Sequence, residues 1–202
     1  MDATMKNPQI QDIYFPNKRK QQENLIVQQN TDTGFGEMNC YDVAHGITIT
    51  YNNLNMDSCY RPIIPQQDFL QIDHCLEGCY ECELSGGSVS FLGEGDLSAS
   101  NLCKGQQLFV GSRIPLKKYR GITVLFEIET AQKTLNSDFK QPDINLAQIR
   151  DTLCADGRSL LIKSKHEIDH IFSELYCVDE RIRLPYSWVK IIELLFFLSL
   201  LD

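Results

Sequence analysis

Residues 69–97, FLQIDHCLEGCYECELSGGSVSFLGEGDL, constrain the fold more than any other stretch, because apolar and polar residues alternate along them. Side chains of a β-strand point alternately to opposite faces, so a period of two predicts strands. Glycines at short intervals predict the turns between them. We therefore expect three short antiparallel strands, at residues 70–76, 80–84 and 88–92, followed by another turn at 93–96. Short strands at this spacing are typical of a sandwich or a small barrel.

The length of the first turn decides which side chains of these strands face inward. A three-residue turn at 77–79 pairs His74 with Cys82 and Ile72 with Leu84, which places both apolar faces on one side. A two-residue turn sets Ile72 against Glu83, a slip that a buried face disfavours. The preferred register therefore predicts an inward-facing set that consists of Ile72, His74, Tyr80, Cys82 and Leu84.

Composition narrows the class of protein. The chain has 202 residues, enough for one domain, or a domain with a helical appendage, around a substantial core. A formal net charge of −8 argues against nucleic-acid binding by this chain itself. Eight cysteines without an apolar leader segment predict reduced thiols and a cytoplasmic location. The apolar run 184–201 carries Lys190 and Glu193 near its middle, which favours a buried or interface helix over a membrane span.

Along the chain, strand patterns come first and helix patterns follow. Residues 1–37 are rich in Gln, Asn and charge, and are predicted to form a polar, partly disordered N-terminal arm. Strands are expected within 38–130, and helices at 144–154, with Asp143 as its cap, at 164–177 and at 186–201. The predicted class is mainly β with C-terminal helices (α+β), a β-barrel or sandwich followed by an antiparallel helical pair.

Two patterns suggest metal chemistry. Residues 166–170 read H-E-x-x-H, the zinc-protease spacing, with Glu193 as a conceivable third ligand. Both histidines fall opposite the apolar stripe of their helix, and Glu167 completes a capping box with Ser164, so we predict an ordinary solvated helix face. No metal ligand, cofactor or catalytic residue is therefore assigned.

The second pattern is C-x3-C-x2-C at 75–82, the spacing of iron–sulfur ligands in radical enzymes. The predicted register turns Cys82 inward and Cys75 and Cys79 outward, so the three thiols do not converge. A redox or soft-metal role for Cys75 and Cys79 stays open. His74, alone among inward residues, is expected to be a hydrogen-bonded core histidine more often than a ligand.

Four segments together are similar to a known family. They are IDHCLEGCYECEL at 72–84, FLGEGDL at 91–97, RIPLKKYRGITVLFEIETAQ at 113–132 and the C-terminal segment 170–202. In this order they resemble the N-terminal regulatory region of AraC-family bacterial transcription regulators, over residues 38–201.

The resemblance implies a division of labour along the chain. Residues 38–130 are expected to form a cupin-like barrel that receives a small effector, and residues 131–202 a helical region that forms a homodimer. Promoter DNA would be bound by a helix-turn-helix domain that follows the present sequence. The histidine ligands of enzymatic cupins are missing, which favours binding over catalysis. The alternatives are a cupin-type metal-binding enzyme and a free-standing interaction module.

Candidate residues can be named for the effector cavity and for the dimer contact. The inward-facing set is expected to line an apolar effector cavity with a few polar groups. Packing within the helical pair and across a two-fold partner is expected from Ile171, Phe172, Leu175, Leu194, Leu195 and Leu198.

Overall fold

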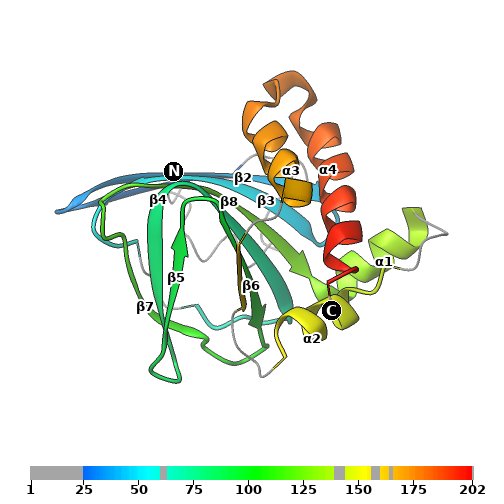
Figure 1. Ribbon diagram of the computed structural model, residues 1–202, viewed down its shortest axis with the longest axis horizontal. Coiled ribbons are helices and arrows are strands. Elements are labelled where there is room, and N and C mark those ends of the chain that lie inside the picture. The colour runs from blue at the N-terminus through cyan, green and yellow to red at the C-terminus, as the bar shows by residue number, and fades with distance from the viewer. Residues whose placement is uncertain (1–24, 60–62, 139–143, 156–159, 164–165, 202) are drawn as a thin grey trace, which may run out of the picture.

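A computed structural model describes residues 25–59, 63–138, 144–155, 160–163 and 166–201 (Figure 1). Its strands are β1 (Leu25–Thr31), β2 (Gly34–Ala44), β3 (Ile47–Asn55), β4 (Phe69–Leu84), β5 (Val89–Gly93), β6 (Asp96–Leu102), β7 (Phe109–Arg113), β8 (Tyr119–Glu127) and β9 (Leu160–Lys163). Its helices are α1 (Ile128–Asp138), α2 (Leu146–Leu153), α3 (His166–Cys177) and α4 (Arg183–Leu198), with a 3₁₀ turn at Glu180–Ile182 before α4.

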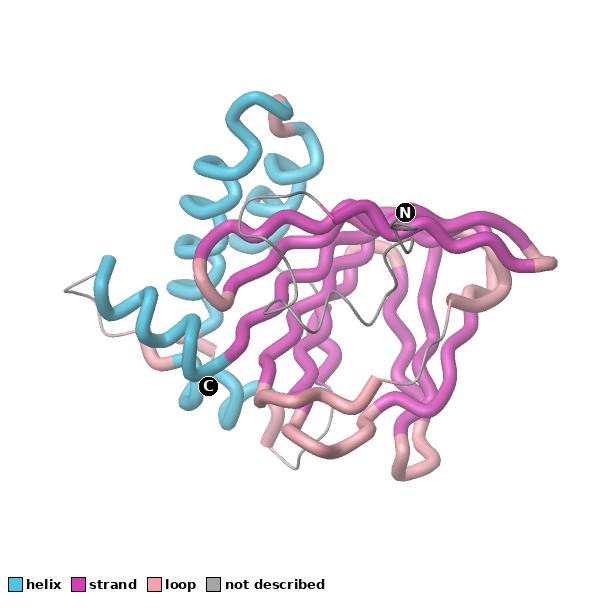
Figure 2. Tube along the Cα trace, turned by 180° about the vertical axis from the view of Figure 1, so that it is seen from behind, coloured by secondary structure: helices cyan, strands magenta, loops and turns pink. Residues whose placement is uncertain are grey.

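The strands form an antiparallel sheet that curls around an interior, and helices cover one side of it (Figures 1 and 2). The strand order is β1-β2-β3-β8-β4-β6-β9, and β5 and β7 both pair with the second half of β4. Helix α4 of the α3–α4 pair packs against β2, while α1 contacts β8 and α2 contacts β6 (Figure 1). The predicted class, mainly β with C-terminal helices, is confirmed.

Most predicted elements are present, but two boundaries differ. Residues 128–138 form α1, whereas strands were expected up to 130 and the first helix of the helical region only from 144. Residues 25–37, predicted as part of the arm, belong to β1 and β2, which pair along their length. Residues 1–24 of that arm lie outside the described part of the chain. So do Asp143 and Ser164, the predicted caps, and the observed cap of α2 is Asn145, whose side chain accepts a hydrogen bond from the Gln148 N–H at 3.0 Å.

The predicted turn at 77–79 is wrong, because β4 runs straight through it as one strand of 16 residues. Its first half pairs with β6 and β8, and its second half with β5 and β7. His74 therefore lies opposite Ile122 and Leu97, and the predicted pair of His74 with Cys82 does not form. The alternation of the sequence was correct, but the strand's partners come from distant segments rather than from a local hairpin.

Gly78 serves a β-bulge instead of a turn. Between Cys75 and Glu77 the register against β8 shifts, and Leu76 is the additional residue. Gly78 has a φ of +82°, and a Cβ atom placed on it would overlap the carbonyl group of Lys118. An additional residue in a strand reverses which side chains face inward. Gln71 and Asp73 therefore share the inner face with Tyr80 and Cys82, although a regular strand would place odd- and even-numbered residues on opposite faces.

The sheet separates two hydrophobic cores. The outer core packs side chains such as Ile72, Val124 and Phe126 against the helices. The inner core fills part of the barrel with side chains that include Met38 and Leu54. The inner side is where a ligand could enter, because it is incompletely filled.

The six residues expected to pack within the helical pair and across a two-fold partner are buried in the single chain. Each is at most 1% exposed in the single chain, all within the outer core: Ile171, Phe172, Leu175, Leu194, Leu195 and Leu198. Because they are covered by their own chain, a partner would have to contact other side chains of α3 and α4. Within the described residues, no helix is long and apolar enough to cross a membrane.

The bulge can be tested by substitution at Gly78. We expect Gly78→Ala to lower the free energy of unfolding by roughly 3 kcal/mol, because it adds a clash with the Lys118 carbonyl, just before β8, to the cost of a positive φ. Gly87 is the matched control, since its φ is +81° and the space around its Cβ position is open. Gly87→Ala should cost about 1 kcal/mol. Equal losses in urea unfolding would contradict the proposed close approach.

Candidate functional site

The barrel interior contains a cavity of about 130 Å³. Its wall is contributed by β2 to β8 and by the segments that precede β4 and β7. The apolar lining residues are Met38, Leu54, Ile63, Pro65, Leu92, Leu102, Leu108 and Phe109. The polar ones are Thr50, Asn52, Gln71, Asp73, Tyr80, Ser90, Ser98, Ser100, Tyr119 and Thr123, with Cys59, Cys82 and Gly111 completing the wall.

Asp73 on β4 is the acceptor at the centre of the polar lining. The Thr123 hydroxyl donates to its Oδ1 at 2.7 Å, and the Gln71 amide donates to its Oδ2 at 2.8 Å. The amide of Asn52 in turn donates to the Thr123 hydroxyl oxygen at 3.0 Å. Burial raises the pKa of the Asp73 carboxyl, while the hydrogen bonds from Gln71, Thr123 and Ser98 oppose that rise.

Tyr80 and Cys82 place a hydroxyl and a thiol on the same wall, from the second half of β4. The Cys59 thiol lies 3.7 Å from the Tyr80 hydroxyl oxygen. Burial raises the pKa of both Tyr80 and Cys82, so both side chains are neutral at physiological pH. They can orient a ligand by hydrogen bonding but supply no charge.

The structure places two of the five predicted site residues at the cavity, Tyr80 and Cys82. Ile72 and His74 face the opposite side of the sheet, in contact with the helices, which corrects their predicted inward position. Leu84 is buried at the end of β4 but does not line the cavity. The sequence reasoning missed Asp73 and its partners, although the alternation would have found them once the bulge was recognised.

His74 connects the sheet to α3. Its ring stacks on Phe172 with the ring centroids 4.2 Å apart and an angle of 7° between the planes. Its Nδ1 lies 3.2 Å from the Tyr176 hydroxyl, which donates to the His74 carbonyl oxygen at 3.2 Å. Burial lowers the pKa of His74 to about 4, against the opposing charges of Asp169 and Asp96. The expectation of a hydrogen-bonded core histidine is confirmed, although this core lies outside the barrel.

The metal-site patterns also singled out residues that do not line the cavity, namely Cys75, Cys79, His170 and Glu193. His170 Nε2 lies 2.8 Å from Glu193 Oε1, between α3 and α4, and the side chains of residues 166 and 167 lie outside the described set. Among the described residues, no three His, Cys, Asp or Glu side chains converge as a metal site would require. Cys75 and Cys79, predicted to point outward, are both buried, and Cys75 belongs to the inner core. Burial raises the pKa of the Cys75 thiol to about 12, so it is a poor nucleophile.

Comparison with known proteins gives likenesses among solved structures. No family model and no curated protein matches the sequence. Fatty-acid-bound ToxT from Vibrio cholerae strain SCE256 has a TM-score of 0.49 at 12% identity, over 77% of this chain and 54% of that one. The AraC-like transcriptional activator CuxR has a TM-score of 0.44 at 10% identity, over 87% and 62%. KdgF from Halomonas sp. has a TM-score of 0.39 at 15% identity, over 50% and 84%.

The chain thus spans little more than half the length of these two regulators. Values this low assign neither a family nor a function.

The burial of His74 gives a testable pH dependence. The unfolded chain takes up a proton at this group near pH 6.5 and the folded chain near 4, so lowering the pH between these values favours unfolding. We expect this group to remove roughly 3 kcal/mol of stability across that window, with no further loss below it.

Urea unfolding of the wild type and of His74→Phe, which keeps a ring against Phe172, isolates the effect. The difference in unfolding free energy between the two proteins should change between pH 6.5 and 4. The contribution of Asp73 titration cancels in this difference, because both proteins contain that residue. A difference that does not vary with pH would contradict the assigned burial.

Proposed function

We propose that this chain is the ligand-sensing and dimerisation region of an AraC-family transcription regulator, with the barrel cavity as its effector site. The observation that carries the proposal is the cavity itself, with an apolar lining and a compact polar cluster around Asp73. Such a combination is the usual character of a small-molecule site. The sequence resemblance over residues 38–201 supports the choice of family.

The cavity volume bounds the size of the effector. A volume of about 130 Å³ is close to the roughly 150 Å³ of an apolar cavity that holds benzene, with its six carbon atoms. A small metabolite with about that number of non-hydrogen atoms therefore fits. The neutral hydroxyl, thiol and amide groups of the wall would fix its orientation.

Strand β4 provides a direct connection from the cavity to the helices. Asp73 faces the cavity, and the next residue, His74, is stacked on Phe172 of α3. An effector that binds one position of this strand more tightly than another shifts the equilibrium between the corresponding packings of α3. The size of that shift is the difference between the two binding free energies. We propose that this is how occupancy of the barrel reaches the helical pair.

Promoter DNA is proposed to contact a helix-turn-helix domain rather than this barrel. The formal net charge of −8 supports that division, because phosphate binding requires clustered basic side chains. The effect of the effector on transcription would then depend on how the helices position that domain.

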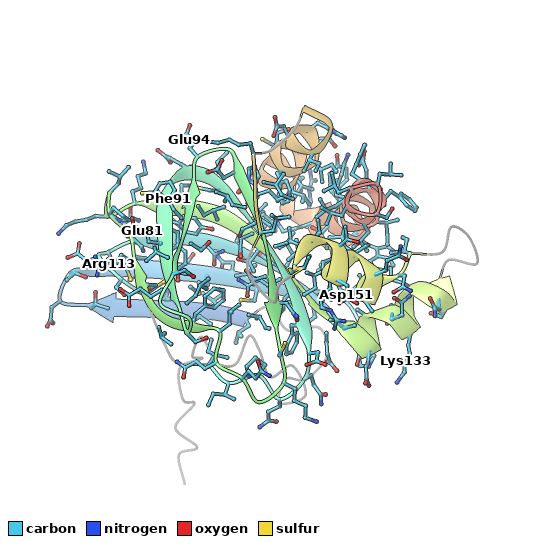
Figure 3. All side chains as sticks on the ribbon, turned by 60° about the horizontal axis from the view of Figure 1, so that its bottom comes forward. Glu81, Phe91, Glu94, Arg113, Lys133 and Asp151 are labelled. Atoms are coloured by element: carbon cyan, nitrogen blue, oxygen red, sulfur yellow. The ribbon has the colours of Figure 1, made fainter. Side chains whose placement is uncertain are left out.

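Filling the cavity should abolish effector binding. Leu92 lines the cavity and is 4% exposed, whereas its neighbour Phe91 is 46% exposed on the outer wall (Figure 3). Native mass spectrometry of the chain mixed with a library of small metabolites should show a bound molecule for the wild type and for Phe91→Trp. Leu92→Trp should lose it while retaining a cooperative thermal transition. Equal ligand retention by both variants would place binding elsewhere.

A homodimer through the helical pair is the second part of the proposal. Val189 and Ile182 are 60% and 50% exposed on and before α4, so they are available to a partner. We expect the chain to sediment as a dimer at high micromolar concentration, and Val189→Glu to shift it toward the monomer by burying a charge. Sedimentation of the wild type as a monomer at that concentration would contradict this part alone.

A further inference from the structure

The hydrogen bonds of Asp73 leave acceptor capacity facing the cavity. A carboxylate oxygen can accept about two hydrogen bonds, and Thr123 and Gln71 each occupy one oxygen of Asp73. Ser98 adds a further bond to the carboxylate. All three partners are neutral, and among the described residues of the lining no cation pairs with the carboxylate, so hydrogen-bond dipoles stabilise it.

The remainder of the lining is uncharged. Among the 21 described residues that line the cavity, Asp73 is the one carboxylate, and none is Lys, Arg or His. The titratable neighbours Cys82 and Tyr119 have raised pKa values, chiefly through burial and secondarily through the charge of Asp73, so both are neutral. Within the described lining, Asp73 is therefore the single site of negative potential.

Charge complementarity then selects the class of ligand. An unpaired carboxylate in a low-dielectric site costs several kcal/mol, and a cation placed beside it offsets much of that cost. A second carboxylate at the same place would instead force one of the two to bind a proton. A neutral ligand leaves the charge of Asp73 without compensation.

We propose that the effector carries a positively charged nitrogen, as an ammonium or guanidinium group, which Asp73 binds while the apolar wall holds the rest of the molecule. This inference rests on the proposed effector site and specifies its chemistry. It makes Asp73 the specificity-determining residue, with Gln71 and Thr123 as the positioning residues that hold its carboxylate.

The titration of Asp73 supports the same assignment. Burial raises its pKa in the empty cavity, and a neighbouring cation would lower that pKa again. Binding of a cation at a pH where Asp73 is partly protonated should therefore release protons. A neutral or anionic ligand would release none.

Three probes of matched shape test the charge preference: hexylammonium, hexanol and hexanoate. Their dissociation constants for the full chain are measured at pH 8 by calorimetry or by ligand-observed NMR. We expect hexylammonium to bind at least about tenfold more tightly than hexanoate, with hexanol between them. Asp73→Asn should remove the preference for the cation and leave the affinity for hexanol within about threefold.

Glu81→Gln is the matched control, because Glu81 lies on β4 with Phe91 and Arg113 as its strand neighbours, outside the cavity lining (Figure 3). It should retain the wild-type preference. The comparison of the three probes on the wild type needs no variant, so a poorly folded Asp73→Asn protein does not prevent a decision.

The outcomes separate this inference from the proposed function. Binding of hexanol or hexanoate as tightly as hexylammonium would overturn the cationic class and leave the effector cavity in place. Failure of all three probes at millimolar concentration would count against the cavity as an effector site as well. A cation preference that survives Asp73→Asn but not Glu81→Gln would place the charged contact on the outer wall and overturn the assignment.

Discussion

The β-bulge in β4 is the constraint on which the rest of the structure depends. One strand supplies partners to β5, β6, β7 and β8, and it must bury apolar side chains against the helices while presenting polar ones to the barrel interior. The additional residue, Leu76, changes which side chains face inward partway along. Gly78 accepts the backbone conformation that this change requires. Without the shift, Asp73 and Tyr80 would lie on opposite sides of the sheet.

Asp73 and His74 are neighbours in β4 but face opposite sides of the sheet. Burial raises the pKa of the first and lowers that of the second, so burial opposes the charged form of each, although three hydrogen bonds stabilise the Asp73 carboxylate. Their surroundings nevertheless differ in kind. His74 is stacked on Phe172 and so connects β4 to α3, whereas Asp73 accepts hydrogen bonds and lines the cavity.

Much of the fold could be predicted from residue patterns, because alternation and helical stripes are local properties. The strands around Ile49 and Val124 and the helix that carries Phe172 were found in this way. The site was only half predicted. The sequence 77–79 has the composition of a turn, and a single-residue bulge leaves no local signature, since it is imposed by pairing with β8. A register that is wrong by one residue exchanges the two faces, which is why His74 was chosen over Asp73.

A cluster of ion pairs joins the helices α3 and α4. Lys190 is only 9% exposed, and its ammonium group lies 2.6 Å from Glu174 of α3 and 2.8 Å from Glu193 of α4. Thermodynamic coupling between two sites is reciprocal. If occupancy of the cavity alters how α3 packs on β4, then a substitution at these ion pairs that shifts the packing of α3 on β4 alters the affinity of the cavity in return. Side chains that never touch the effector would then help to set the concentration at which it is sensed.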